Sequence, residues 1–142
     1  MTKRISKLAM AVVVGLSVPT ISVSTVNANK AKDNCPQWKR LALDVGFSRR
    51  DWVKLDKIIW RESRCMPKAI NENSRVDGST WSRDWGLAQI NDYSWITYLR
   101  GKKIVTKSTE LLNPRNNLEA AYELYKYSDD RHDDPWLQWK TN

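Results

Sequence analysis

Residues 58–91 read IIWRESRCMPKAINENSRVDGSTWSRDWGLAQIN and mark a change from a helical to an extended pattern. Before and within the start of this stretch, apolar residues recur at steps of three and four. This spacing predicts a helix that reaches about Arg64, and Pro67 prevents its continuation. Beyond Pro67 the helical period disappears, and the pair Asp77-Gly78 is typical of a hairpin turn. The stretch therefore predicts a helix followed by a small sheet or an ordered loop.

Helical patterns also lie on both sides of this stretch. Gly46 and Gly101 are stop signals, and Asn113-Pro114 supplies an N-cap and a first-turn proline. The predicted helices cover residues 38–45, 48 to about 64, 93–99 and a segment that begins at residue 114. No repeat or linker divides the 142 residues, so one domain is expected. The fold class is predicted to be α+β, mostly helical with one small β-hairpin lobe.

Residues 1–28 have the features of a secretory signal peptide. Three basic residues precede an apolar run over residues 8–18, and a small-residue pattern ends at Ala28. The run is shorter than the roughly 20 apolar residues that span a bilayer, and Pro19 interrupts it. Cleavage would leave residues 29–142 as the working domain and lower the formal net charge from +8 to +5, because three basic residues leave. An uncleaved anchor is the alternative.

Export would also change how the two cysteines are interpreted. Cys35 and Cys65 are the only thiols of the chain, and in an oxidising compartment such a pair is expected to form a disulfide. A metal site made from two cysteines and the single histidine, His132, is not favoured. We therefore predict a disulfide between Cys35 and Cys65 and no metal site.

Glu62 is the most informative residue of the predicted second helix. The face that carries Trp52, Leu55 and Ile59 continues to position 62, so an acid stands where an apolar side chain is expected. A carboxylic acid that is protonated near neutral pH can act as a general acid. The alternative is a glutamate held in a salt bridge or lying in a frayed last turn.

The motifs that follow Glu62 resemble those of the lysozyme superfamily. Glu62-Ser63 and the Gly-Leu-x-Gln-Ile run that starts at Gly86 are similar to soluble-lytic-transglycosylase-type domains. Asp77-Gly-Ser-Thr and the run Asp84-Trp-Gly-x-x-Gln-Ile-Asn are similar to chicken-type lysozymes. Asn113-Pro114, Asn117 and Ala120-Ala121 resemble the helix that the bacterial domains place after the active site. The resemblance covers residues 58–127 in the expected order, and it implies a lysozyme-like fold with a cleft beside the hairpin lobe.

The resemblance also implies roles for two carboxylates. In both branches the glutamate of the Glu-Ser pair donates a proton to the glycosidic oxygen, which assigns that role to Glu62. In chicken-type lysozymes the acid before the aromatic-Gly pair is the second carboxylate, which corresponds to Asp84. Many transglycosylase-type relatives use the acetamido group of the substrate instead, so Asp84 could also be a turn residue that bonds to nearby backbone amides. Asp77 is expected to serve only the hairpin turn.

Further residues are expected to bind the sugar. Gln89 and Asn91 match superfamily positions that shape the sugar subsites, although either could instead hold the β segment together. The indoles of Trp81, Trp85 and Trp95 are expected to form a wall for sugar rings, whereas those of Trp38, Trp52 and Trp60 are expected in the core. Trp136 and Trp139 could serve in either place. The Ala-Tyr-Asn-Ala-Gly stretch of many transglycosylase domains is absent, which leaves Tyr125 or Tyr127 as the tyrosine that supports the catalytic acid.

Taken together, the sequence predicts an exported, monomeric enzyme that cleaves peptidoglycan. The expected partner is the glycan strand, at the β-1,4 bond between N-acetylmuramic acid and N-acetylglucosamine, and no cofactor is required. Action outside the cytoplasm, either secreted or in the periplasm or cell wall, follows from the signal peptide. Two alternatives remain open: a secreted cationic wall-binding module without turnover, and a basic binder of nucleic acid or membrane, for which no dedicated motif is present.

Overall fold

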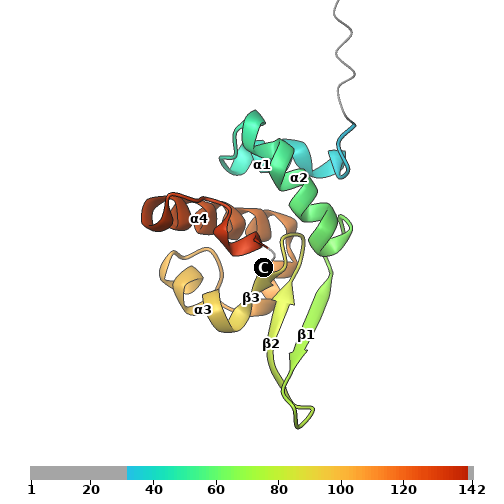
Figure 1. Ribbon diagram of the computed structural model, residues 1–142, viewed down its shortest axis with the longest axis vertical. Coiled ribbons are helices and arrows are strands. Elements are labelled where there is room, and N and C mark those ends of the chain that lie inside the picture. Colours follow the sequence, from blue (N-terminus) through green and yellow to red (C-terminus); the bar gives the residue numbers. More distant parts are fainter. Residues whose placement is uncertain (1–31, 141–142) are drawn as a thin grey trace, which may run out of the picture. The chain divides into compact units, whose positions relative to one another are not determined.

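The computed structural model describes residues 32–140, so the predicted signal peptide lies outside the described residues. Figure 1 shows a group of helices and a small sheet whose β1–β2 hairpin extends beyond the helices. The elements in chain order are η1 (Pro36–Trp38), α1 (Lys39–Val45), α2 (Arg49–Ser63), β1 (Ile70–Ser74), β2 (Thr80–Trp85), β3 (Ile90–Asn91), α3 (Asp92–Gly101), η2 (Ser108–Leu112), α4 (Pro114–His132) and η3 (Leu137–Trp139). The predicted α+β class and lysozyme-like organisation are confirmed. Within residues 32–140, no helix is both long and apolar enough to traverse a bilayer.

The four predicted helices are all present. A capping box fixes the start of α2: the Ser48 side chain accepts from the backbone N–H of Asp51, and the Asp51 carboxylate accepts from the backbone N–H of Ser48. Asn113 caps α4 by accepting from the N–H of Arg115, with Pro114 in the first turn. The short 3₁₀ helices η1 and η2 were not predicted, because three to five residues carry too little periodicity to be recognised.

The sheet has three antiparallel strands in the order β1-β2-β3. Asp77 builds the turn between β1 and β2 as expected, since its Oδ1 accepts from the N–H and the hydroxyl of Ser79 at 2.9 and 2.7 Å. Gly78 follows with a φ of 82°, a conformation that glycine adopts without strain. The two residues of β3 were not predicted, because such a short strand has no readable alternation.

The core lies between the helices and the inner face of the sheet. Trp52, Leu55 and Ile59 on α2 are buried, as the apolar spacing predicted. The prediction for Trp60 is wrong, because its side chain is 43% exposed. The guanidinium of Arg64 lies over its ring, 4.9 Å from the centroid. Position 60 belongs to the outer face of α2, and the bulk of an indole misled the prediction.

Asn117 connects the sheet to the helices through its buried side chain. Its Oδ1 accepts from the N–H of Ala88 at 2.9 Å. Its Nδ2 donates to the carbonyl oxygens of Trp85 at 2.7 Å and Leu111 at 2.9 Å. Gly86 passes so close to Asn117 that an added Cβ would collide with this amide. One side chain of α4 therefore fixes the chain between β2 and β3 and the end of η2.

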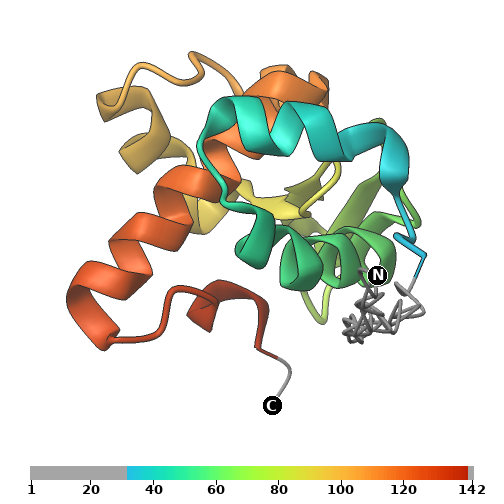
Figure 2. The same ribbon diagram turned by 90° about the horizontal axis from the view of Figure 1, so that it is seen from above.

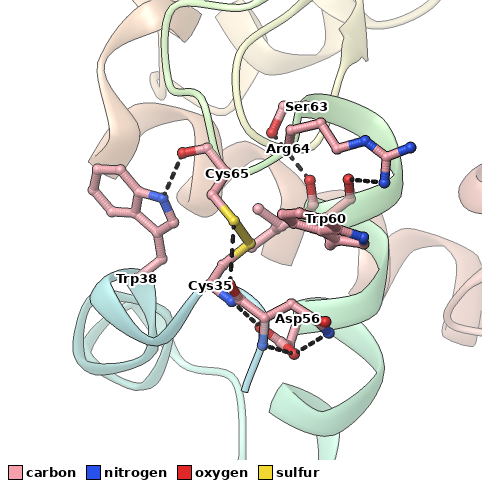
Figure 3. Close-up of a disulfide and its surroundings, with 9 residues drawn as sticks. Cys35, Trp38, Asp56, Trp60, Ser63, Arg64 and Cys65 are labelled. Carbon is pink, nitrogen blue, oxygen red and sulfur yellow. Dashed lines mark hydrogen bonds between the residues drawn. A yellow bond between two sulfur atoms is a disulfide. The ribbon is translucent and has the colours of Figure 1, made fainter. Parts of the chain in front are cut away.

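The predicted disulfide between Cys35 and Cys65 is present, and Figure 3 shows its surroundings. The buried carboxylate of Asp56 accepts from the N–H of Cys35 at 2.7 Å and from the N–H of Asn34 at 2.8 Å. The indole of Trp38 donates to the carbonyl oxygen of Cys65 at 3.0 Å. These contacts attach the beginning of the described chain to the end of α2.

Replacement of Asn117 by alanine should destabilise the fold strongly. Three buried backbone groups would lose their partner, and each unsatisfied group costs roughly 1–3 kcal/mol, so we expect the free energy of unfolding to fall by at least about 3 kcal/mol in urea titrations. The matched control is Asn116→Ala, because Asn116 donates only one bond, to the carbonyl oxygen of Glu110. Equal losses for the two variants would contradict this role of Asn117.

Removal of the disulfide by Cys35→Ser together with Cys65→Ser should lower the free energy of unfolding by about 3–4 kcal/mol. The reason is that the crosslink restricts a loop with a sequence separation of 30 residues in the unfolded chain. Urea titrations of the parent with and without reductant provide the control, since the reduced parent should match the double variant. A double variant as stable as the oxidised parent would show that the crosslink adds nothing.

Candidate active site

A cavity of about 360 Å³ lies where the helices meet the sheet, and we call it the candidate cleft. Its lining comes from all three strands and from α2, α3, α4 and η3. The residues are Glu62, Asn71, Asp84, Gln89, Ile90, Asn91, Trp95, Leu124, Gln138 and Trp139. The two predicted catalytic carboxylates thus line the same cavity, one from the end of α2 and the other from β2.

Glu62 lies in the last turn of α2 with 26% of its side chain exposed. Arg61 donates from Nε and Nη2 to Oε1 of Glu62, at 3.0 and 2.6 Å. Oε2 accepts no hydrogen bond from residues 32–140. One oxygen of Glu62 is therefore held, while the other is available to a molecule in the candidate cleft.

Arg61 has a second contact that restrains the cleft wall. Its Nη2 also donates to the carbonyl oxygen of Trp139, at 2.6 Å. After α4 the chain turns back, so that η3 lies near α2 (Figure 2). The Trp139 indole is held from the other side by a bond to the carbonyl oxygen of Ala88, at 2.9 Å. The same guanidinium thus orients Glu62 and the segment that carries Trp139.

Asp84 is the centre of a polar row that crosses the sheet. The register pairs it with Asn71 of β1 on one side and with Asn91 of β3 on the other. Asn73 and Ser82 are the next pair along β1 and β2, two residues away from Asn71 and Asp84, and therefore face the same side. Strand pairing alone thus surrounds this carboxylate with amides.

Three amide groups hold the carboxylate of Asp84. Asn91 donates to Oδ1 at 2.8 Å, and Asn73 and Asn71 donate to Oδ2 at 3.0 and 3.4 Å. Asn91 and Asn73 also donate to the hydroxyl of Ser82, each at 3.1 Å. These partners are side chains, so Asp84 does not bond to nearby backbone amides as a turn residue would. The row fixes a carboxylate that faces the candidate cleft.

Gln89 and Asn91 line the candidate cleft but also have structural contacts. Gln89 has a positive φ of 48°, and its amide donates to the carbonyl oxygen of Gly86 at 2.8 Å. Asn91 caps α3 by accepting from the N–H of Ser94 at 3.0 Å, in addition to its bonds to Asp84 and Ser82. The amides of both residues are therefore oriented before any ligand arrives.

Trp95 and Trp139 provide the aromatic part of the lining. Trp95 packs edge-on against Tyr127, with ring centroids 5.4 Å apart, and Tyr98 contacts both rings. The Trp139 indole packs beside that of Trp136 at 6.1 Å. Two indoles supported in this way present fixed apolar surfaces to the candidate cleft.

Trp85 and Tyr125 lie outside the lining, although the sequence placed both at the site. The Trp85 indole is 7% exposed and donates to Asp92 at 3.0 Å. The Tyr125 hydroxyl donates to Asp51 at 3.2 Å. Burial and the charge of Asp51 raise the pKa of Tyr125 to about 12. Neither the Trp85 nor the Tyr125 side chain is therefore directed at the candidate cleft.

Tyr127 contacts the Trp95 ring but is also absent from the lining.

Several residues around the two acids were not predicted from the sequence. Asn71 and Asn73 carry a readable signal, because they alternate at the strand period in the segment that precedes the hairpin turn. Gln138 and the bond from Arg61 to the Trp139 carbonyl oxygen carry no such signal, since both depend on the path of the chain after α4. Within residues 32–140, no group of three or more His, Cys, Asp or Glu side chains is arranged to hold a metal ion.

Comparison with known proteins identifies the family. Searches of curated proteins and of solved structures gave no match. A family model described as a lysozyme-like domain, SLT_3, matches residues 39–141 and so includes both acids, the sheet and all four α-helices. The chain therefore belongs to the lysozyme-like SLT_3 family, whose domain implies peptidoglycan as the substrate.

Proposed function

We propose that this protein cleaves the β-1,4 bond between N-acetylmuramic acid and N-acetylglucosamine in peptidoglycan, with water as the acceptor. The observation that carries the proposal is that Glu62 and Asp84, from α2 and β2, line one cavity in a chain of the lysozyme-like family. Glycoside hydrolysis in this class needs one carboxyl group to transfer a proton and one carboxylate to face the positive charge at the sugar carbon.

Glu62 is the proposed general acid and base. Its Oε1 can continue to accept from Arg61 while Oε2 carries the proton. That proton passes to the glycosidic oxygen as the bond from this oxygen to the muramic acid carbon breaks. A water molecule then attacks that carbon and returns a proton to Glu62. One bond is broken, one water is consumed, and the enzyme recovers its starting state.

Asp84 is the proposed second carboxylate. The amides of Asn71, Asn73 and Asn91 donate to it, and such bonds hold the carboxylate in place. A negative group in this position stabilises the oxocarbenium-like transition state. This arrangement favours hydrolysis over the internal cyclisation of transglycosylases, which requires no second acid. The expected products have reducing ends.

The proposed site of action is outside the cytoplasm, after removal of residues 1–28. A disulfide in the domain suits an oxidising compartment, and the peptidoglycan substrate lies there. The protein is also proposed to act as a monomer.

Glu62→Gln should lower the rate of cell-wall clearing at least a hundredfold, because the amide cannot supply the proton and general acid catalysis contributes about 10²–10⁴-fold. Loss of turbidity of purified walls provides the measurement. The matched control is Glu119→Gln on α4, which makes the same chemical change at a residue that is not among those lining the candidate cleft. A Glu62→Gln variant that clears walls as fast as the parent would disprove the proposed role.

Asp84→Asn should also lower the rate at least tenfold, since the carboxylate that faces the developing charge is lost. Asp77→Asn in the hairpin turn, outside the lining, serves as the control and should stay within about twofold of the parent. Mass spectrometry of the parent's products should show reducing ends. Anhydro-muramyl ends, together with an active Asp84→Asn variant, would instead identify a transglycosylase.

A further inference from the structure

A second cavity, of about 270 Å³, lies between α2 and the C-terminal segment, and we call it the basic pocket. It is lined by Lys54, Lys57, Ile58, Arg61, Trp136, Trp139 and Lys140. Four of these seven side chains are cationic, and two are indoles. The pocket therefore combines positive charge with a small apolar surface, since Trp136 and Trp139 are each 7% exposed and Ile58 is 4% exposed.

The charges of the basic pocket are only partly neutralised by the protein. Lys140 pairs with Asp134, and Arg61 pairs with Glu62. Lys54 and Lys57 are exposed, and neither has an acidic partner within 4 Å in residues 32–140. The Lys54 ammonium instead lies over the Trp136 ring, 5.5 Å from its centroid. The charge of Asp134 also acts on Lys54 from a longer distance. Neither lysine is held in a close ion pair, so both can pair with an anion.

The acids of α2 are directed away from these lysines. Asp51 bonds to Ser48 and to Tyr125. The Asp56 carboxylate is buried against the N–H groups at the start of the described chain. The outer face of the helix is left with cations at positions 50, 54, 57, 61 and 64, at steps of four and three residues.

The basic pocket shares a wall with the candidate cleft. Trp139 lines both cavities. Arg61 lines the basic pocket and also bonds to Glu62 in the candidate cleft. A substrate held in the candidate cleft would therefore need only a short side branch to reach Lys54 and Lys57.

We propose that the basic pocket binds a carboxylate of the peptide stem that branches from the glycan strand. This inference rests on the proposed function, because it takes the strand in the candidate cleft to be peptidoglycan, whose muramic acid residues carry peptides with free carboxylates. Lys54 and Lys57 pair with the carboxylate, and the Trp136 and Trp139 indoles contact the aliphatic part of the stem. The proposal makes the enzyme selective for strands that still carry their stems.

The dimensions favour a short branch over an anionic polymer. A volume of about 270 Å³ lies just below the range of ligand pockets, roughly 300–1,000 Å³, so it suits only a small group such as a carboxylate on a short aliphatic arm. A phosphate polymer pairs with cations alone and makes no use of the two indoles that lie beside Lys54 and Lys57. The mixed lining is therefore matched best by an amino-acid side branch.

The test is a fluorescence or calorimetric titration with a soluble stem peptide that has free carboxylates, and with the same peptide after amidation of its carboxylates. The parent should bind the free acid and bind the amide at least fivefold more weakly. Lys54→Gln with Lys57→Gln should weaken binding of the free acid about fivefold, near the middle of the roughly two- to thirtyfold range that the loss of two exposed charge pairs of about 0.2–1 kcal/mol each implies. Added salt should weaken binding further.

The matched control is Lys103→Gln with Lys107→Gln, which removes the same charge from exposed positions outside the basic pocket. It should bind the peptide within about twofold of the parent. The proposal would be overturned if the parent bound the acid and the amide equally, or if the control variant lost as much binding as the Lys54 and Lys57 variant. It would also be overturned if the two lysines were needed to bind inorganic phosphate or anionic lipid vesicles but not the peptide. Because these titrations involve no bond cleavage, their failure is distinct from failure of the proposed activity.

Discussion

The buried amide of Asn117 is the contact on which the arrangement of the sheet and helices depends. It accepts from the N–H of Ala88, which follows β2. It also donates to the carbonyl oxygens of Trp85, at the end of β2, and of Leu111, in η2. Within residues 32–140, no other side chain forms hydrogen bonds to all three of these segments. Because Asp84 lies one residue before Trp85, this amide also restrains the end of β2 that carries the polar row. The position of the second carboxylate is thus a consequence of a structural hydrogen bond.

The first carboxylate is positioned by a different set of constraints. Burial of Trp52, Leu55 and Ile59 sets the rotation of α2 and directs Glu62 toward the sheet. The helix ends at once afterwards, with Arg64 and Cys65 in the left-handed region at φ values of 54° and 65°. Such backbone costs free energy, and the disulfide and the Trp38 bond hold it in place (Figure 3). The same short segment therefore ends the helix, carries the acid and closes the crosslink.

The helices and the hairpin could be predicted from the sequence, because short-range patterns determine them. Contacts between segments that are distant in the sequence could not be predicted. Capping and stop signals gave the four helices, and Asp77-Gly78 gave the hairpin. The apolar spacing of α2 and the ordered motifs identified Glu62 and Asp84, which line one cavity. By contrast, the approach of Arg61 and Trp139 to each other depends on the return of the chain after α4, for which no short motif exists. Trp85 was chosen because it lies within the motifs, and Tyr125 was one of two candidates that no motif decided between. Strand alternation directs Trp85 to Asp92, and the face of α4 directs Tyr125 to Asp51.

The proposed mechanism requires that Glu62 and Asp84 lie on opposite sides of one glycosidic bond. The most direct measurement is a crystal structure of the Glu62→Gln variant with a glycan oligosaccharide that contains the muramic acid to glucosamine linkage. The proposed roles predict that the glycosidic oxygen lies within about 3.5 Å of the side chain at position 62. The Asp84 carboxylate should face the anomeric carbon from the other side. An oligosaccharide bound away from the candidate cleft, or bound there with both side chains distant from the linkage, would contradict it.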